Sequence, residues 1–241
     1  MLVKSSSVPA IVQHIESLQP TTADVVMLLI ADDEMPDIPA LIDALNQKNI
    51  RFFGGIFPGL LFGNKRFKSG CILRKFKVLL PPFCVSGIGS TALSGLPEEI
   101  NPLRQPKGTA VVLLDGLSPN ISLFLEKLNN LLGEQCNFIG GGAGYLSFTQ
   151  HPCVFSNQGF VEDAAVVCVI DQETRLGVRH GWEQLAGPLV ATKIEVNTII
   201  QLNWKRAIDV YNNIVEKDCG IALHKDNFAE IAQAYPFGIF R

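Results

Sequence analysis

The most prominent motif with chemical potential is a glycine run, Gly140-Gly141-Gly142-Ala143-Gly144. Consecutive glycines let backbone N–H groups approach a ligand closely and form an anion-binding concavity. The run is not a dinucleotide fingerprint, because it feeds a hairpin instead of opening a helix, and no Gly-Lys-Ser/Thr follows it as in a P-loop. Two interpretations stay open: a ligand-binding turn, or a strand end where two backbones approach closely.

A second group surrounds a glycine in Val178-Arg179-His180-Gly181-Trp182-Glu183. An imidazole, an indole and a carboxylate suit recognition of a small polar ligand by stacking and hydrogen bonding. They are weak evidence for catalysis, since His180 has no nucleophile elbow, no HExxH motif and no second His at metal-ligand spacing. A structural role for His180 is the alternative. The predicted ligand-binding residues are Gly140, Gly141, Gly142, His180, Gly181, Trp182 and Thr192, with no catalytic residue, metal or cofactor.

Two other sites could supply a nucleophile. Gly108-Thr109 and Gly70-Cys71 each place a hydroxyl or thiol after Gly at the start of an apolar strand, as self-processing N-terminal-nucleophile hydrolases require. Ordinary strands often begin in this way, and the nucleophile would be freed only by chain cleavage. The sequence therefore favours a protein that is not an enzyme, with a hydrolase as the third hypothesis.

The remaining reactive side chains have structural explanations. The carboxylates of Asp32-Asp33-Glu34 and Asp37 could hold a hard metal ion, but carboxylates at the N-terminus of a helix explain them better. The six cysteines lie far apart without a CxxC pair, so we expect them to be reduced and mostly buried. The basic cluster from Lys65 to Lys77 is more typical of an edge hairpin than of a nucleic-acid site.

The composition limits the class of protein. Of 241 residues, 47% are hydrophobic and 18% charged, so the chain can bury enough surface to fold. The longest apolar stretches, Val25 to Ala31 and Ala164 to Ile170, are too short to span a bilayer. A net charge of -3 offers no broad footprint for nucleic acid or anionic lipid. Because the N-terminus has no apolar signal region, we expect a cytoplasmic location.

An internal repeat predicts how the elements position these residues. A shift of 86 positions aligns Val25–Leu28 with Val111–Leu114 and Phe52–Gly55 with Phe138–Gly141. The same shift aligns Ile38, Ile42 and Leu45 with Phe124, Leu128 and Leu131. Two strand-helix-strand-hairpin units, about 21–100 and 107–200, therefore predict an α/β fold with a mixed, largely buried sheet, outer helices and pseudo-twofold symmetry.

The chain outside the aligned segments gives further predictions. Ser118 is a candidate N-cap for a helix that buries Ile121, Leu125, Leu128 and Leu132 and ends at Gly133. Strands are expected at Phe160–Ile170, at Arg175–His180 and in a pair from Val190 to Gln201, before a helix that buries Ala207, Ile208, Tyr211, Ile214 and Val215. The predicted domains are residues 1–216 and a separate segment, 217–241.

The second half resembles a known family. Phe138–Gly144, Cys153–Gly159 with Asp163–Val167, His180-Gly181-Trp182 with Gly187 and Thr192, and Ala207 with Tyr211 occur in the order of the FIST domain, N-terminal part. The resemblance covers roughly residues 20 to 216. It implies a cytosolic sensory module that binds small ligands such as amino acids, often attached to signalling outputs. Asn197 and Asn203-Trp204 depart from it, because glycines are expected there.

The resemblance also implies that residues 217–241 begin a C-terminal FIST module, with a docking tail as the alternative. The first functional hypothesis is a sensor that binds a small ligand near the glycine run and signals to a separate protein. The second is a protein-protein interaction scaffold without a ligand, and self-association is compatible with both. Neither hypothesis involves nucleic acid or a membrane.

Overall fold

The computed structural model describes residues 1–90, 107–177, 181–195 and 198–239. It divides into two compact units, Met1–Gly177 and Val178–Arg241. The predicted boundary after residue 216 falls inside the second unit, within helix α4 (Ala207–Cys219). That helix continues until Gly220, which has a left-handed φ of 69°. The proposed division at 216 and 217 is therefore not the division between the compact units.

The first unit is built on one mixed sheet of nine strands, in the order β10-β9-β3-β2-β6-β11-β7-β8, with β1 added beside β6. Two neighbouring pairs, β2 with β3 and β7 with β8, are parallel, and the other pairs are antiparallel. The predicted α/β class with a mixed sheet is confirmed. The strands are β1 (Leu2–Val3), β2 (Asp24–Ala31), β3 (Phe52–Phe57), β6 (Cys71–Ser86), β7 (Gly108–Asp115), β8 (Cys136–Ala143), β9 (Val154–Ser156), β10 (Gly159–Val161) and β11 (Ala164–Ile170).

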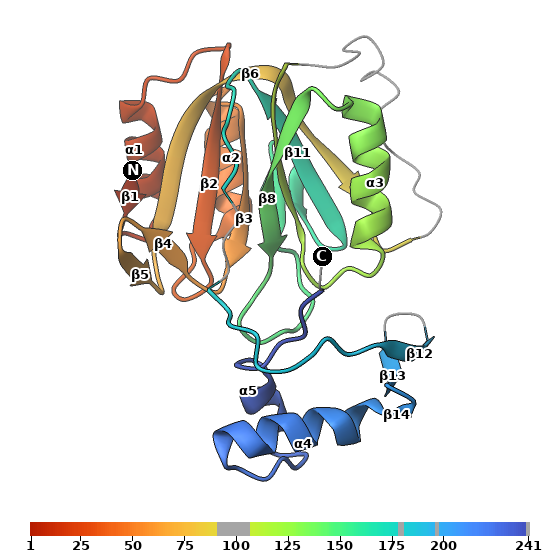
Figure 1. Cartoon of the computed structure of the whole chain (residues 1–241). Coiled ribbons are helices and arrows are strands. Elements are labelled where there is room, and N and C mark those ends of the chain that lie inside the picture. The colour runs from red at the N-terminus through yellow and green to blue at the C-terminus, as the bar shows by residue number, and fades with distance from the viewer. Residues whose placement is uncertain (91–106, 178–180, 196–197, 240–241) are drawn as a thin grey trace. The chain divides into compact units, whose positions relative to one another are not determined.

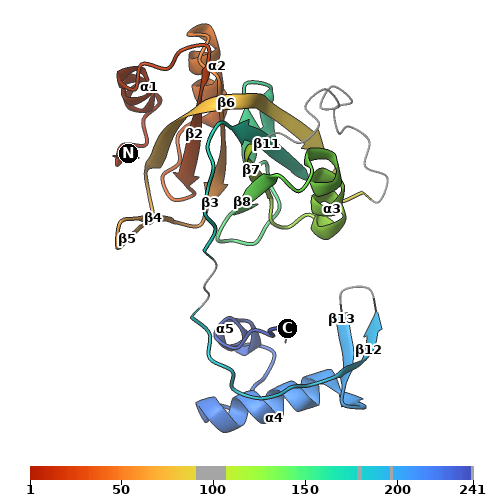
Figure 2. The ribbon, with the colours of Figure 1, turned by 45° about the horizontal axis from the view of Figure 1, so that its top comes forward.

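The long strand β6 joins the two halves of this sheet. Its residues 71–77 pair with β2, and its residues 78–86 pair with β11. Figure 1 and Figure 2 show β6 curving over both halves, so the sheet folds toward itself. The backbone N–H of Gly144, just after β8, donates to the carbonyl oxygen of Ile56 in β3 at 2.8 Å. The ends of two strands that are far apart in the sheet order therefore meet.

Three helices cover the outer faces of the curved sheet: α1 (Val8–Ser17), α2 (Ile38–Gln47) and α3 (Ile121–Leu132). Figure 2 shows α1 and α2 on one side and α3 on the other. Each helix buries an apolar stripe, and these stripes contribute to two core clusters. Among the described residues, no helix has the length and apolarity to cross a membrane.

Helix α3 differs from its prediction at two positions. Leu125 is 39% exposed, and Phe124 occupies the buried position in its place. The N-cap is Asn120 and not Ser118. The hydroxyl of Ser118 instead donates to a carboxylate oxygen of Asp163 at 2.7 Å. Gly133 ends the helix as predicted.

Both halves of the sheet contain a parallel strand-helix-strand unit, but the strand registers differ. The 86-residue shift aligns Phe52 with Phe138 and Val26 with Val112. Phe52 pairs with Val26, whereas Phe138 pairs with Ala110, two positions before Val112. A difference of two residues leaves every side chain on the same face of the sheet. The pseudo-twofold symmetry stays a prediction.

Some predicted hairpin strands are interrupted or absent in the structure. A short sheet pairs β4 (Leu60–Phe62) with β5 (Lys65–Phe67), so the first part of the basic cluster lies on a hairpin as expected. The second part, Arg74 to Lys77, lies in β6 between β2 and β11, so the edge-hairpin prediction is wrong for that part. The predicted strand Phe160–Ile170 is interrupted at Glu162-Asp163, where Asp163 has a φ of 44°. Residues 175–177 are not a strand, which corrects that part of the prediction, and 178–180 lie outside the described residues.

The second unit contains a three-stranded antiparallel sheet of β12 (Ala191–Glu195), β13 (Thr198–Leu202) and β14 (Lys205–Arg206), followed by α4 and α5 (Phe228–Ala232). The predicted strand pair is confirmed. Tyr211 and Val215 are buried on α4 as expected, whereas Ile208 is 40% exposed. The ring of Tyr211 lies 5.7 Å from that of Phe228, which places α5 against α4.

We expect Trp204→Gly to stabilise the second unit. Asn203 and Trp204 connect β13 to β14 and both have positive φ, 49° and 60°. Such two-residue turns favour glycine, and a side chain in this conformation costs about 1 kcal/mol. Trp204 is 78% exposed, so its removal loses little burial. Thermal unfolding followed by circular dichroism measures the gain.

The matched variant is Asn203→Gly, which should not stabilise the unit. The side-chain oxygen of Asn203 accepts from the backbone N–H of Val190 at 2.9 Å, and this bond would be lost. A lower melting temperature for Trp204→Gly would contradict the expected strain.

Candidate functional site

The seven predicted ligand-binding residues are divided between the units. Gly140, Gly141 and Gly142 lie in β8, at one end of the strand order of the first unit. Gly181, Trp182 and Thr192 belong to the second unit, and His180 lies outside the described residues. Their assembly into one ligand site stays a prediction.

Close backbone packing accounts for two of the three glycines. A Cβ atom on Gly140 would lie 1.8 Å from the carbonyl oxygen of Val112, and one on Gly142 would lie 3.0 Å from the Cα of Gly116. No atom lies within 4 Å of the corresponding position on Gly141. Close packing against β7 therefore explains Gly140, and a tight contact with Gly116 favours glycine at position 142.

Thr192 has a structural hydrogen bond. Its Oγ1 accepts from the backbone N–H of Trp204 at 2.9 Å and so supports the β13–β14 turn. Trp182 is 52% exposed, and Gly181 has a left-handed φ of 70°. The Thr192 hydroxyl keeps its own hydrogen and one further lone pair for other partners.

The carboxyl ends of the parallel strands form a different candidate site. The loop after β8 contacts the ends of β2, β3 and β7. Its Leu146 N–H donates to Asp32 Oδ2 at 2.8 Å, and its Gln150 side chain donates to Asp115 Oδ2 at 2.8 Å. Ligands of open α/β sheets bind at the carboxyl ends of strands, where loops from different strands meet. This edge is therefore the first place to look for a ligand site.

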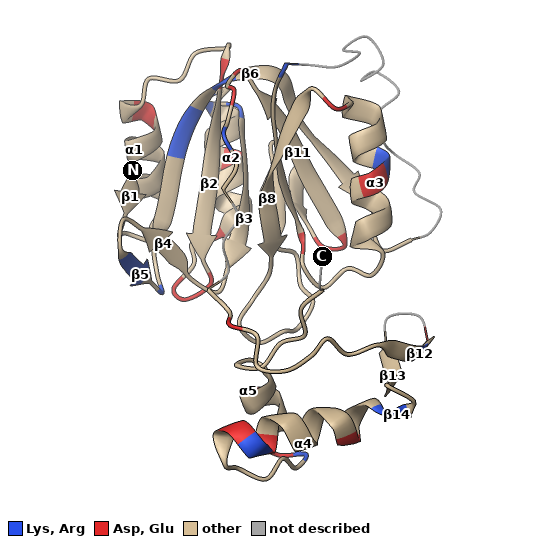
Figure 3. Ribbon diagram, in the orientation of Figure 1, with Lys and Arg blue, Asp and Glu red and all other residues tan. Residues whose placement is uncertain are grey.

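A hollow of about 300 Å³ lies at this edge. Two acidic side chains after β2 line it together with one basic side chain of β5 and one just after β5. Figure 3 shows the basic residues of β5 in blue. Within the described residues, neither Arg66 nor Lys68 forms a salt bridge. The lining residues are Asp32, Asp33, Pro58, Arg66, Lys68 and Leu146.

The acidic residues before α2 have separate roles. Asp37 caps the helix, because its Oδ1 accepts from the Ala40 N–H at 3.0 Å, as the helix N-terminus interpretation predicts. Asp32 and Asp33 instead line the hollow. Sequence reasoning missed this role, although their position after a buried strand was the available signal. In the part of the chain that the structure describes, no group of three acidic, His or Cys side chains is placed to hold a metal ion.

Asp115 anchors the same loop from the end of β7. It is only 1% exposed, and its oxygens accept from the N–H groups of Leu117 at 3.0 Å and Asp163 at 2.9 Å as well as from Gln150. Three donors compensate the buried carboxylate for the water that it loses. The sequence analysis did not single out Asp115.

The two candidate nucleophiles are buried in the intact chain. The Thr109 hydroxyl is fully buried and donates to the carbonyl oxygen of Gln172 at 2.7 Å. Burial raises the pKa of the Cys71 thiol to about 12. A thiol with so high a pKa is almost entirely protonated at neutral pH and is a poor nucleophile.

We expect the native thiols to differ widely in reactivity. Cys71, Cys153 and Cys168 are at most 1% exposed, and burial raises the pKa of each to about 12. Cys219, near the end of α4, is partly exposed and should react first with a water-soluble maleimide at pH 7.5. Mass spectrometry of timed labelling identifies the order, and denatured protein is the control. Equal rates for Cys71 and Cys219 in native protein would contradict the expected burial.

The structure and the comparisons together define the class of protein. The first unit is an α/β domain with a charged hollow at the carboxyl ends of its parallel strands. A family model, the FIST N domain, matches residues 24–205. The chain belongs to this family, whose domains serve sensory signal transduction, and the resemblance is confirmed. No curated protein and no solved structure matched the chain.

Proposed function

We propose that this chain is a non-enzymatic sensory domain that binds a small zwitterionic ligand such as an amino acid. Membership of the FIST N family supports the sensory role. The hollow with opposite charges, lined by Asp32 and Asp33 on one part and by Arg66 and Lys68 on another, is the observation that carries the ligand class. The cytoplasm as its location and a separate signalling protein as its partner belong to the same proposal.

The charges of the hollow match those of a zwitterion. A carboxylate is held by Arg66 and Lys68 through charge-assisted hydrogen bonds, while an ammonium group interacts with Asp32 and Asp33. A volume of about 300 Å³ is at the small end of ligand pockets and suits a metabolite better than a nucleotide. Arg66 and Lys68 are available for this role because no acidic side chain of the described residues forms a salt bridge with them.

The test is a binding screen of the full chain against the twenty standard L-amino acids, using thermal shift and then calorimetry. A ligand at one hundred times its Kd should stabilise the fold by about 2.7 kcal/mol. The double variant Arg66→Gln with Lys68→Gln should lose about tenfold or more in affinity. Lys65→Gln is the matched control, because Lys65 lies on β5 but does not line the hollow. The absence of binding by every amino acid would contradict the proposal.

A second candidate function is a protein-protein interaction scaffold. Large apolar side chains are exposed in the second unit, which is typical of surfaces that bind a partner. The most exposed within 181–205 are Trp182, Leu185, Val190, Ile194 and Trp204. Sedimentation of the chain over a range of concentrations tests self-association as one form of this function. Residues 217–241 lie beyond the matched range 24–205 and are proposed to belong to a following FIST module or a docking tail.

A further inference from the structure

Residues 144–153 connect β8 to β9. Among the described residues that line the hollow, this loop is the only one with a hydrogen bond to Asp115 at the end of β7. We name it the β8–β9 loop. Leu146 contributes to the hollow and donates its N–H to Asp32 at 2.8 Å. Gln150 donates to Asp115 at 2.8 Å, and the Tyr145 hydroxyl donates to the carbonyl oxygen of Pro152 at 2.7 Å.

The two carboxylates that hold this loop differ in environment. Asp115 is 1% exposed and accepts from three donors, one of which is Gln150. Asp32 is only half-buried and lines the hollow, and Leu146 is 61% exposed. A hydrogen bond in contact with solvent has a small net free energy, so a stronger donor can replace it.

An ammonium group is such a donor. Charge-assisted hydrogen bonds to a carboxylate are roughly twice as strong as bonds between neutral groups, and a backbone N–H is uncharged. A cationic group that binds the same oxygen, Asp32 Oδ2, therefore competes with the Leu146 N–H for it. Because Leu146 also lines the hollow, the bound molecule contacts the loop directly.

We infer that Asp32 is a positioning residue that couples the hollow to the β8–β9 loop: it holds Leu146 when the hollow is empty and releases it to the ammonium group of a bound ligand. The inference rests on the proposed function and adds how ligand binding would change the β8–β9 loop. Release frees a segment that carries Leu146 and Phe148, which are 61% and 69% exposed. Phe148 has a φ of 53°, which phenylalanine rarely adopts, so the held conformation is strained. Ligand binding thus changes the mobility of an exposed apolar segment.

Hydrogen exchange of the full chain tests the inference. The probe is an amino acid that binds in the screen, at saturation, with the free protein as reference. The expected result is about three- to tenfold faster amide exchange in residues 144–149, because one charged acceptor is lost. Peptides from β7, which lies under α3, should exchange at the same rate with and without the amino acid.

Three variants separate the two roles of Asp32, which are to hold the β8–β9 loop and to bind the ligand. Asp32→Ala should speed exchange in the β8–β9 loop without ligand and should also weaken ligand binding. Asp32→Asn keeps an oxygen acceptor for Leu146 but lacks the charge, so it should weaken binding with little effect on loop exchange. Gln150→Ala, on the Asp115 side, should speed loop exchange and leave the affinity unchanged, because Gln150 does not line the hollow.

The outcomes distinguish this inference from the proposed function. If no amino acid binds, the proposed function fails and the ligand-dependent switch fails with it. If an amino acid binds but loop exchange is unchanged or slower, the inference is overturned and the proposed function stands. Unchanged loop exchange in Asp32→Ala would overturn it as well. Faster exchange with ligand, reproduced without ligand by Asp32→Ala, supports it.

Discussion

Gly140→Ala should destabilise the first unit strongly, by about 2–4 kcal/mol. The added Cβ would lie 1.8 Å from the carbonyl oxygen of Val112, far inside van der Waals contact, and 2.7 Å from its carbonyl carbon. Relief of this contact requires β8 to move away from β7, which disrupts the parallel pair Val112 with Gly140. Urea unfolding followed by circular dichroism measures the loss, and an insoluble product would agree with it.

The matched control is Gly141→Ala. A Cβ on Gly141 meets no atom within 4 Å, so this variant should unfold within about 1 kcal/mol of the natural protein. The pair also separates the two interpretations of the glycine run. Similar stability for the two variants would contradict the packing explanation, whereas a loss of ligand binding in a stable Gly141→Ala would support the binding turn.

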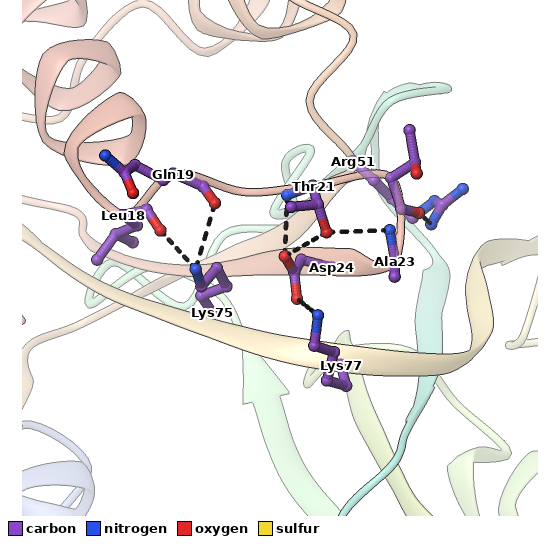
Figure 4. A network of polar contacts seen from close by, with 9 residues as sticks. Leu18, Gln19, Thr21, Ala23, Asp24, Arg51, Lys75 and Lys77 are labelled. Atoms are coloured by element: carbon purple, nitrogen blue, oxygen red, sulfur yellow. Dashed lines mark hydrogen bonds and ion pairs between the residues drawn. The ribbon is translucent and has the colours of Figure 1, made fainter.

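Asp24→Ala should cost about 3 kcal/mol of unfolding free energy, because it removes two hydrogen bonds to a buried carboxylate, each worth about 1.5 kcal/mol or more. Asp24 is 3% exposed, and its Oδ2 accepts from the N–H and the hydroxyl of Thr21 at 2.9 and 2.7 Å. Its Oδ1 lies 3.0 Å from Lys77 Nζ, and Figure 4 shows these groups together where β2 begins beside β6. Chemical unfolding at pH 7 measures the effect.

Lys77→Ala is the matched variant and should cost about 1 kcal/mol or less, since the Lys77 side chain is 62% exposed. The aspartate in that variant keeps both Thr21 bonds. A cost for Lys77→Ala equal to that for Asp24→Ala would contradict the view that the Thr21 bonds are the main stabilising contacts.

The same carboxylate gives the protein a pH dependence. The hydrogen bonds from Thr21, and then Lys77, hold the pKa of Asp24 well below its usual value. A carboxyl group whose folded-state pKa is lowered contributes stability that is fully present above its unfolded pKa, about 4, and is lost as the pH falls toward the folded value. The natural protein should therefore lose more stability between pH 5 and pH 2 than Asp24→Asn loses, which acid unfolding curves compare.

Much of the fold follows from local patterns in the sequence. The apolar strands β2, β7 and β11, the buried stripes of the helices and the burial of most cysteines are set by which residues are apolar and at what spacing. Such patterns report whether one side of an element faces water, so they could be predicted without knowing what covers it. The FIST resemblance rests on motif order in the same way.

Two of the errors in prediction come from contacts between residues that are far apart in the chain. Ser118 is typical of an N-cap, but its hydroxyl bonds to Asp163, which is 45 residues away in the chain. The strand break at Asp163 depends on that network, since the same residue accepts from Gly87 and Gly89. Contacts between distant residues decided both details, and no short-range pattern reports them.

The ligand hollow is the clearest case of what only the tertiary structure decided. Asp32, Arg66 and Leu146 belong to three different loops and hairpins, and the sequence gives no period or spacing that joins them. They meet because β6 is long enough to pair with β2 along one half and with β11 along the other, which brings the ends of β3 and β8 together. The sequence alone determined the elements, the family and the apolar faces, because these depend on neighbours along the chain. Strand register and the folding of the sheet on itself depend on packing across it, and they decided which charges share a site.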